Sequence, residues 1–232
     1  METEKFALGG LNITVSADHR FGTDAFLLAG FAKPKRKDTV CDLCTGCGII
    51  PLLFCKKDPP KKIYAVDIQE EAIDLLRISA EENGLSGIIQ PVLCDLKSPD
   101  VPRETMDMVT VNPPYFRSRS GLERLSKAQA IARHELLCSL DDVVKSADYL
   151  LKYGGTLKMC HIPERLTDVI CTFRKYKIEP KVITFVQNKE GDRPWLVLIS
   201  GKKGAKAGLK ITEPLNMRSG NEYTKELLSV YE

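Results

Sequence analysis

Residues 39–48 read Thr-Val-Cys-Asp-Leu-Cys-Thr-Gly-Cys-Gly, and this stretch decides the fold class. Residues 40–43 predict a short buried strand, residues 44–48 a loop with two glycines, and residues 49–55 a helix. In open α/β sheets, this order places a ligand at the carboxyl end of the strand. The third glycine of a dinucleotide fingerprint is missing, because Pro51 stands in its position. A nucleoside cofactor without a diphosphate is therefore favoured, and a nicotinamide-dependent enzyme is disfavoured.

Downstream of this loop, strands and helices alternate, which predicts βαβ units and an open, mostly parallel sheet. Strands are expected over residues 62–66, 88–94, 106–111 and 156–162, and helices over residues 70–82, 140–151 and 166–176. Gly154-Gly155 are expected to stop the second of these helices. Residues 182–186 and 195–199 have no helix between them, which indicates an antiparallel hairpin at the edge of the sheet.

The first 38 residues precede this alternating pattern. Residues 6–15 alternate around Gly9-Gly10, as a hairpin would, and Thr23-Asp24 predict the N-cap of an apolar helix over residues 25–32. A basic linker over residues 33–37 follows. We therefore expect residues 1–38 to form a hairpin and helix extension, and residues 39–232 to form a single compact domain.

The composition is that of an ordinary globular protein. The chain has 232 residues, 43% of them hydrophobic and 28% charged, which argues against wholesale disorder. Its longest apolar stretch, residues 43–55, is broken by Pro51 and is shorter than the roughly 18 residues of a membrane-spanning helix. The polar start over residues 1–5 is unlike a secretory signal, so a cytoplasmic location is expected. The eight cysteines are interpreted as reduced, and those in apolar runs (Cys55, Cys94, Cys138 and Cys160) as buried small hydrophobes.

Acidic residues recur where the predicted parallel strands end. Asp67 follows the second strand, where a carboxylate can accept hydrogen bonds from both hydroxyls of a ribose. Asp95 follows the third strand and could accept from an adenine amino group, with Leu96 beside the ring. Each acid alone is better explained as a helix cap or a solvated charge. Together with Asp42 they favour a site, and S-adenosylmethionine is the cofactor that fits, because it joins adenosine to a sulfonium amino acid without phosphate.

Cys41, Cys44 and Cys47 are spaced C-x-x-C-x-x-C, which raises the possibility of a metal or iron–sulfur site. A fourth ligand is missing, because Pro51 stands where the ferredoxin pattern needs cysteine. Cys41 also lies inside a predicted strand. We therefore expect no metal at these residues.

Asn112-Pro113-Pro114-Tyr115 ends the predicted strand over residues 106–111 and is the most specific feature of the chain. Two consecutive prolines make a stiff turn, which could serve a structural purpose alone. An amino group on adenine or on an amide is a poor nucleophile, because its lone pair is delocalised. The Asn112 side-chain oxygen and the Pro113 carbonyl can each accept one of its hydrogens, and Tyr115 can stack on a planar target. Catalysis would then come from alignment and from hydrogen bonds to developing charge.

The order of these motifs resembles the class I S-adenosylmethionine-dependent amino-methyltransferases, which implies a Rossmann-like α/β fold. The segment Phe21-Gly22-Thr23-Asp24-Ala25 is similar to one in a single branch, the bacterial tRNA(Val) adenine-N6 methyltransferases, which modify the adenine beside the anticodon. The resemblance covers nearly the whole chain, and it implies N6-methylation of a tRNA adenine. The Asn-Pro-Pro-Tyr motif is specific for amino methylation but not for the substrate.

The resemblance also implies roles for individual residues. The catalytic set is Asn112, Pro113, Pro114 and Tyr115. The cofactor-binding set is Phe21, Gly22, Thr23, Asp42, Cys44, Thr45, Gly46, Gly48, Asp67, Ile68, Asp95, Leu96 and Asn112. Arg20 and Phe21 are placed by the resemblance at the methionine end of the cofactor. The family usually has glycine at the position of Cys44, and a residue with a side chain is expected to keep a negative φ there.

Positive charge follows the catalytic motif directly and favours RNA as the substrate. Within residues 117–133, one acidic residue, Glu123, accompanies five basic residues. These candidate RNA-binding residues are Arg117, Arg119, Arg124, Lys127 and Arg133. A second basic run consists of Lys202, Lys203, Lys206 and Lys210. Such runs can also be solvent-exposed basic loops that bind no RNA. The expected partner is a tRNA, with no membrane, and the protein is expected to be a monomer or a weak dimer.

Other functions remain open at this point. A protein-glutamine N5-methyltransferase carries the same motif, but its relatives have a helical domain ahead of the fold, and about 38 residues are too few for one. Guanine-N2 RNA methyltransferases carry a close variant of the motif. A non-catalytic, cofactor-binding RNA-associated protein is the fourth possibility, and it would keep its biological effect when Asn112 is replaced by alanine.

Overall fold

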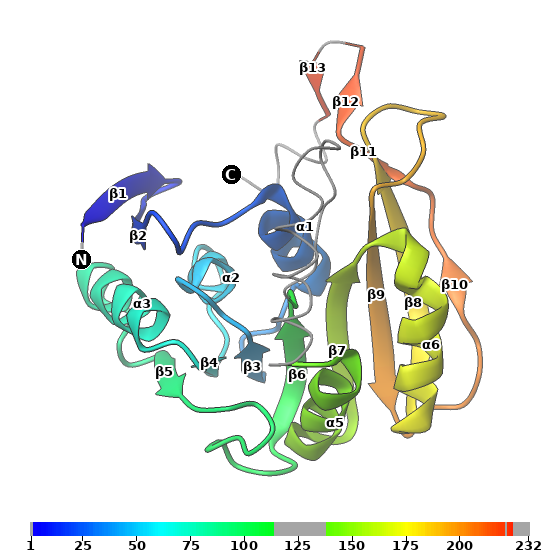
Figure 1. The fold of residues 1–232 in the computed structure, drawn as a ribbon, viewed down its shortest axis with the longest axis horizontal. Coiled ribbons are helices and arrows are strands. Elements are labelled where there is room, and N and C mark those ends of the chain that lie inside the picture. Colours follow the sequence, from blue (N-terminus) through cyan, green and yellow to red (C-terminus); the bar gives the residue numbers. More distant parts are fainter. Residues whose placement is uncertain (1, 114–137, 221, 225–232) are drawn as a thin grey trace, which may run out of the picture.

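A single large sheet organises the molecule (Figure 1). A computed structural model describes residues 2–113, 138–220 and 222–224. Within them nine strands pair in the order β10-β8-β9-β7-β6-β3-β4-β5, with β11 also paired to β8. The strands are β3 (Thr39–Leu43), β4 (Lys62–Asp67), β5 (Ile89–Leu93), β6 (Met106–Val111), β7 (Leu151–His161), β8 (Ile178–Gln187), β9 (Leu196–Lys203), β10 (Lys210–Ile211) and β11 (Leu215–Asn216).

The strands β5, β4, β3, β6 and β7 run parallel and form the half of the sheet that the alternating pattern predicts. The chain proceeds from β3 outward through β4 to β5, and then returns to the other side of β3 with β6 and β7. The strand order therefore reverses between β3 and β6. In open α/β sheets, ligands bind beyond the carboxyl ends of the strands at such a reversal.

Helices cover both faces of the sheet. One face is covered by α1 (Thr23–Ala32), α2 (Ile49–Phe54) and α3 (Glu70–Glu82), and buries side chains such as Leu28, Leu52 and Leu76. The other face is covered by α5 (Leu140–Leu150) and α6 (Leu166–Lys175), and buries Val144 and Phe173. A 3₁₀ turn, η1 (Pro163–Arg165), precedes α6. Burial of these two apolar layers stabilises the sheet on both sides. None of the helices in the described part of the chain is both long and apolar enough to span a membrane.

The predicted antiparallel hairpin is confirmed, and its strands are longer than expected. β9 pairs antiparallel with both β7 and β8. The short strands β10 and β11 then pair parallel with β8 and form this edge of the sheet. The hairpin therefore joins the parallel half to the edge strands instead of ending the sheet itself.

The expected role of Gly154-Gly155 is wrong. The helix α5 ends at Leu150, and β7 begins at Leu151, so both glycines lie inside the strand. The pairing of β6 with β7 is irregular between Met106 and Met108, and a Cβ on Gly155 would lie 2.9 Å from the carbonyl oxygen of Met106. A close backbone approach, rather than a helix stop, explains this glycine.

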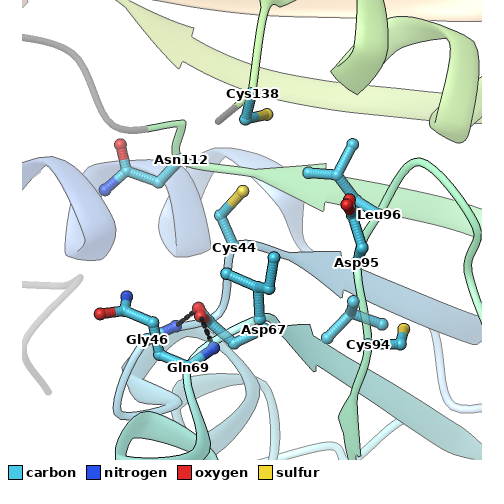
Figure 2. A pocket seen from close by; sticks show the side chains of 11 residues that line it. Cys44, Gly46, Asp67, Gln69, Cys94, Asp95, Leu96, Asn112 and Cys138 are labelled. Carbon is cyan, nitrogen blue, oxygen red and sulfur yellow. Dashed lines mark hydrogen bonds between the residues drawn. The ribbon is translucent and has the colours of Figure 1, made fainter. Parts of the chain in front are cut away.

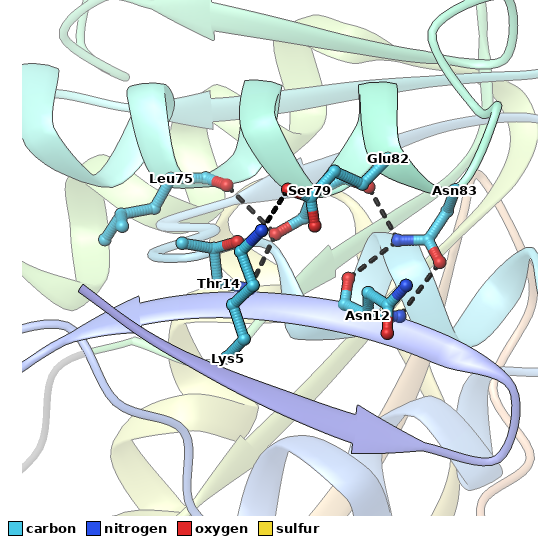
Figure 3. A network of polar contacts seen from close by, with 7 residues as sticks. All are labelled: Lys5, Asn12, Thr14, Leu75, Ser79, Glu82 and Asn83. Carbon is cyan, nitrogen blue, oxygen red and sulfur yellow. Dashed lines mark hydrogen bonds and ion pairs between the residues drawn. The ribbon is translucent and has the colours of Figure 1, made fainter.

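The first hairpin is confirmed as β1 (Thr3–Leu8) and β2 (Leu11–Ser16), and it packs against α3 (Figure 3). The backbone N–H of Thr14 donates to Ser79 Oγ at 2.9 Å, and the side chain of Asn83 bonds both backbone polar groups of Asn12. These contacts tie the first residues to the sheet domain. The expected division of the chain at residue 38 stays a prediction.

The expected N-cap of α1 is wrong by one residue. Gly22 occupies the N-cap position, no side chain caps the helix there, and Thr23 is the first helical residue. The Asp24 carboxylate instead accepts from the N–H of Ala25 at 3.1 Å. Gly22, Asp24 and Ala25 at this start of α1 line a cavity together with the loop after β3.

Candidate active site

The loop after β3 has an unusual backbone. Gly46 and Gly48 adopt φ of 56° and 80°, and Cys44 also adopts a positive φ, at 56°. The expectation that Cys44 keeps a negative φ is therefore wrong. The N–H of Thr45 donates to the Val66 carbonyl at 3.0 Å, which draws the loop toward β4 and outweighs the local preference. A left-handed residue with a side chain costs about 1–2 kcal/mol.

Asp42 lies beneath this loop and is fully buried. Its carboxyl accepts from Thr45 Oγ1 at 2.7 Å and from Thr110 Oγ1 at 2.5 Å. Burial raises the pKa of Asp42 to about 7, and the two hydroxyl hydrogen bonds lower it in part. Asp42 therefore connects the loop to β6, and it lines neither of the two cavities described below.

Asp67 is the last residue of β4, and its carboxylate, unlike that of Asp42, lines a cavity. One carboxylate oxygen accepts from the N–H of Gly46 at 2.8 Å, and the other accepts from the N–H of Gln69 at 3.0 Å. Two carboxylate oxygens offer about four acceptor positions, so these contacts leave capacity for further donors. Asp67 thus holds the glycine loop with part of its carboxylate and can present the remainder to a ligand.

A cavity of about 300 Å³ opens beside Asp67, at the lower limit for small-molecule sites (Figure 2). It brings together seven of the predicted cofactor residues, which are Cys44, Gly46, Asp67, Ile68, Asp95, Leu96 and Asn112. Val66, Gln69, Cys94 and Cys138 also line it, although their sequence positions predicted no role at the site. We call this space the first cavity. Its lining is mainly apolar with a few carboxylate and amide groups, which suits a nucleoside.

A second cavity, of about 410 Å³, lies on the side of α1. Its lining includes the predicted residues Phe21, Gly22 and Thr45, together with Arg20 and Asp24. Cys44, Gly46 and Asn112 line both cavities, so the two spaces meet at these residues. A Cβ built on Gly46 would have no atom within 4 Å, so a ligand can approach the backbone there.

Two other predicted cofactor residues line neither cavity. Thr23 is the first residue of α1, next to Gly22. Gly48 is the N-cap of α2, and a Cβ there would lie 2.1 Å from a methyl carbon of Leu76. The approach of α3 therefore explains why Gly48 has no side chain.

Asn112 follows β6 at the junction of the two cavities, where the sequence analysis expected the chemistry. Its side-chain oxygen lies 3.0 Å from the sulfur of Cys160, which donates a hydrogen bond to it. Cys160 is fully buried in β7, as expected for a small hydrophobe, but the sequence offered no signal of this contact. Pro113, which follows Asn112, is the last residue that the structure describes before the gap at residues 114–137. Pro114, Tyr115 and the five basic residues Arg117, Arg119, Arg124, Lys127 and Arg133 lie outside the described residues.

The cysteines at the first cavity differ from the expectation. Cys94 and Cys138 are half-buried instead of buried, because they line the first cavity. The thiols of Cys44 and Cys138 face each other (Figure 2), and their mutual hydrogen bond raises the pKa of Cys44 and lowers the pKa of Cys138. In the described ranges, no three His, Cys, Asp or Glu side chains are arranged to hold a metal ion.

None of the lysines of the second basic run lines either cavity. β9 runs antiparallel to β7, so Lys202 pairs with Thr156 in the middle of β7, whereas His161 at its carboxyl end pairs with Val197. The Lys203 ammonium donates to the carbonyls of Asp148 and Leu151, which end α5. Lys203 therefore caps the end of α5, on the side of the sheet away from Asn112. Lys210 pairs with Val182 on β8, three strands away from β6.

Comparisons with known proteins agree with this geometry. Residues 16–163 match the family model of the methyltransferase small domain. A curated relative from Phocaeicola vulgatus, named tRNA1(Val) (adenine(37)-N6)-methyltransferase, is 28% identical over 79% of this chain and 76% of its own length. The structure of a predicted O-methyltransferase from Agrobacterium tumefaciens superimposes with a TM-score of 0.72, at 21% identity, over 90% of this chain and 95% of that one. The M. jannaschii TYW2 protein, solved with AdoMet, gives a TM-score of 0.60 at 14% identity, over 86% and 85%.

The expected Rossmann-like α/β fold, with a mostly parallel sheet and antiparallel strands toward one edge, is confirmed by the sheet topology and by these structural neighbours. The family model covers more than half of the chain, including the glycine loop, the three strand-end acids Asp42, Asp67 and Asp95, and Asn112. The chain belongs to the methyltransferase small domain family.

Proposed function

We propose that this protein transfers a methyl group from S-adenosylmethionine to N6 of an adenine in a tRNA, with the adenine beside the anticodon of a valine tRNA as the target. The observation that carries the proposal is the place of Asn112, whose side chain lines both cavities where they meet. An amide there can hold an amino group of one ligand beside the reactive end of another. The curated relative from Phocaeicola vulgatus supports the choice of adenine and of tRNA.

The first cavity suits the adenosine half of the cofactor. Asp67 has acceptor positions left for the two ribose hydroxyls, Asp95 can accept from the adenine amino group, and Leu96 and Ile68 can flank the ring. The open backbone at Gly46 leads to the second cavity, where Thr45, Phe21 and Gly22 would receive the methionine half. Thr23, Asp42 and Gly48 would act through the loop and helix backbones that they support, since they line neither cavity.

The bound cofactor supplies an electrophilic methyl group on a sulfonium. The task of the protein is to bring an amino nitrogen to that methyl with its lone pair free. The Asn112 oxygen and the Pro113 carbonyl can each accept one hydrogen of the amino group, which reduces delocalisation of the lone pair into the ring. The methylated nitrogen then releases one proton, and the cofactor would leave as a neutral thioether that keeps the electron pair of the broken S–C bond. Stacking of the target on Tyr115 and contacts from residues 117–133 to phosphates remain predictions.

The proposal is tested by substitution of Asn112 by alanine in the full-length protein. Label transfer from methyl-labelled cofactor to bulk tRNA should fall by about 10²–10³-fold, the usual cost of removing one hydrogen-bonding group that acts in the transition state. Cofactor affinity, measured by calorimetry with S-adenosylhomocysteine, should change less than about threefold, because neither the carboxylates nor the loop are altered.

Mass spectrometry of the tRNA nucleosides identifies the product. N6-methyladenosine supports the proposal, whereas N2-methylguanosine would assign the protein to guanine methylation. Label found only in an added protein substrate would favour the glutamine-methylating alternative. No transfer from a preparation that binds cofactor would leave the non-catalytic, RNA-associated role.

A further inference from the structure

The sulfur of Cys160 contacts the amide on which the proposed chemistry depends. β6 and β7 are paired in register up to Val111 and Met159, so Asn112 and Cys160 are the next residues along the two parallel strands. Their side chains lie on the face of the sheet that α1 covers, since Cys160 belongs to that core cluster and Asn112 lines the cavity on the side of α1. The distance from sulfur to the amide oxygen is 3.0 Å.

The direction of this hydrogen bond determines which way the amide is turned. The terminal torsion of asparagine is broad and nearly two-fold, so oxygen and NH₂ can exchange places at little cost. A thiol is a donor and only a weak acceptor, so the contact favours the orientation with the oxygen toward Cys160. The opposite orientation would place the NH₂ group against the sulfur. The carbonyl oxygen has two lone pairs, and one of them remains for a second donor.

We infer that Cys160 is a positioning residue, which holds the Asn112 amide in the single orientation that presents its oxygen to the amino group of the target base. The inference rests on the proposed function. A thiol suits this place because Cys160 is fully buried among apolar side chains, where it costs less to desolvate than a hydroxyl. Thr110 precedes Asn112 by two residues and lies on β6. Its hydroxyl donates a hydrogen bond to Asp42 on β3, the neighbouring strand on the side opposite β7.

The first test compares two substitutions that differ in the donor. Cys160→Val keeps the approximate volume and removes the donor, whereas Cys160→Ser keeps a donor. Under saturating cofactor and tRNA, Cys160→Val should lower the single-turnover rate about three- to tenfold, the worth of one neutral hydrogen bond. Cys160→Ser should stay within about threefold of the wild type, and the affinity for S-adenosylhomocysteine should be unchanged in both.

A matched control separates positioning from packing. Cys55 is a buried cysteine of the same core cluster, and it lines neither cavity. Cys55→Val should leave the rate unchanged. A wild-type rate in Cys160→Val overturns the inference. Equal losses of rate in Cys160→Val and Cys160→Ser overturn it as well, because the effect would then come from the size and packing of the cysteine side chain and not from its hydrogen bond.

The second test does not depend on activity. The S–H stretch of a thiol falls in frequency when the thiol donates a hydrogen bond, and the infrared band of Cys160 is found by subtracting the spectrum of Cys160→Val. In Asn112→Ala this band should move to higher frequency, and a band that stays in place contradicts the contact. Full transfer activity in Asn112→Ala would instead overturn the proposed function, so the two failures are distinguishable.

Discussion

The neighbouring strands β3 and β4 each carry, near the carboxyl end, an aspartate predicted to bind the cofactor, yet the two carboxylates have different surroundings. Asp42 is fully buried and is bonded to two hydroxyls. Asp67 is bonded to two backbone N–H groups and lines the first cavity. The register explains the difference, because Asp42 pairs with Ala65, and Asp67 lies two residues further toward the carboxyl end. An acidic residue near the end of a strand can therefore support the loop or bind a ligand, depending on how close it lies to the carboxyl edge of the sheet.

Removal of the Asp67 carboxylate should give the largest effect of this comparison. Asp67→Ala loses the proposed contacts to the ribose hydroxyls, and hydrogen bonds to a charged group contribute about 1.5–3 kcal/mol. We expect the dissociation constant for S-adenosylhomocysteine to rise about 10²-fold, as measured by calorimetry. Asp74→Ala removes the same charge from an exposed ion pair with Arg77 on α3 and should change affinity less than about twofold. Equal affinity in both variants would show that Asp67 serves the loop alone.

Substitution of Asp42 should affect the pH dependence of stability instead of cofactor affinity. With a pKa of about 7 in the folded protein and about 3.8 when unfolded, the Asp42 carboxyl binds its proton more tightly in the folded state. Its contribution to stability is complete below about pH 4 and is lost as the pH rises through about 7. Compared with Asp42→Asn, the wild type should lose about 2 kcal/mol of unfolding free energy between pH 5 and 7. Urea denaturation of both proteins across this range measures the difference, and parallel curves would contradict it.

The smallest effect is expected from Cys44, which has a positive φ that glycine adopts without strain. Cys44→Gly relieves about 1–2 kcal/mol of backbone strain and costs about 0.5–1 kcal/mol in unfolded-state entropy. We expect a net stabilisation of about 0.5–1 kcal/mol by urea denaturation at pH 7. A clear loss of stability would mean that the contact of Cys44 with Cys138 outweighs the strain.

The amino-acid sequence by itself determined the alternation of elements and much of their extent. The helix over residues 70–82 and the strand over residues 106–111 were predicted with the bounds that the structure has, because apolar periodicity and the Asn83-Gly84 and Asn112-Pro113 signals are local. The sequence also predicted seven of the residues that line the first cavity, because they lie at or just after the ends of parallel strands. Parallel strands bring their carboxyl ends to one edge of the sheet wherever the chain between them runs.

Only the tertiary structure decided what each side chain faces. The register of β3 against β4 separates the roles of Asp42 and Asp67, and the pairing of β6 with β7 places Cys160 against Asn112. The antiparallel direction of β9 leads Lys202 and Lys203 away from the carboxyl end of β6, and Lys203 bonds the end of α5 instead. These outcomes depend on contacts between residues far apart in the chain. The sequence patterns predicted the direction of the strands but not which side chains the register would bring together.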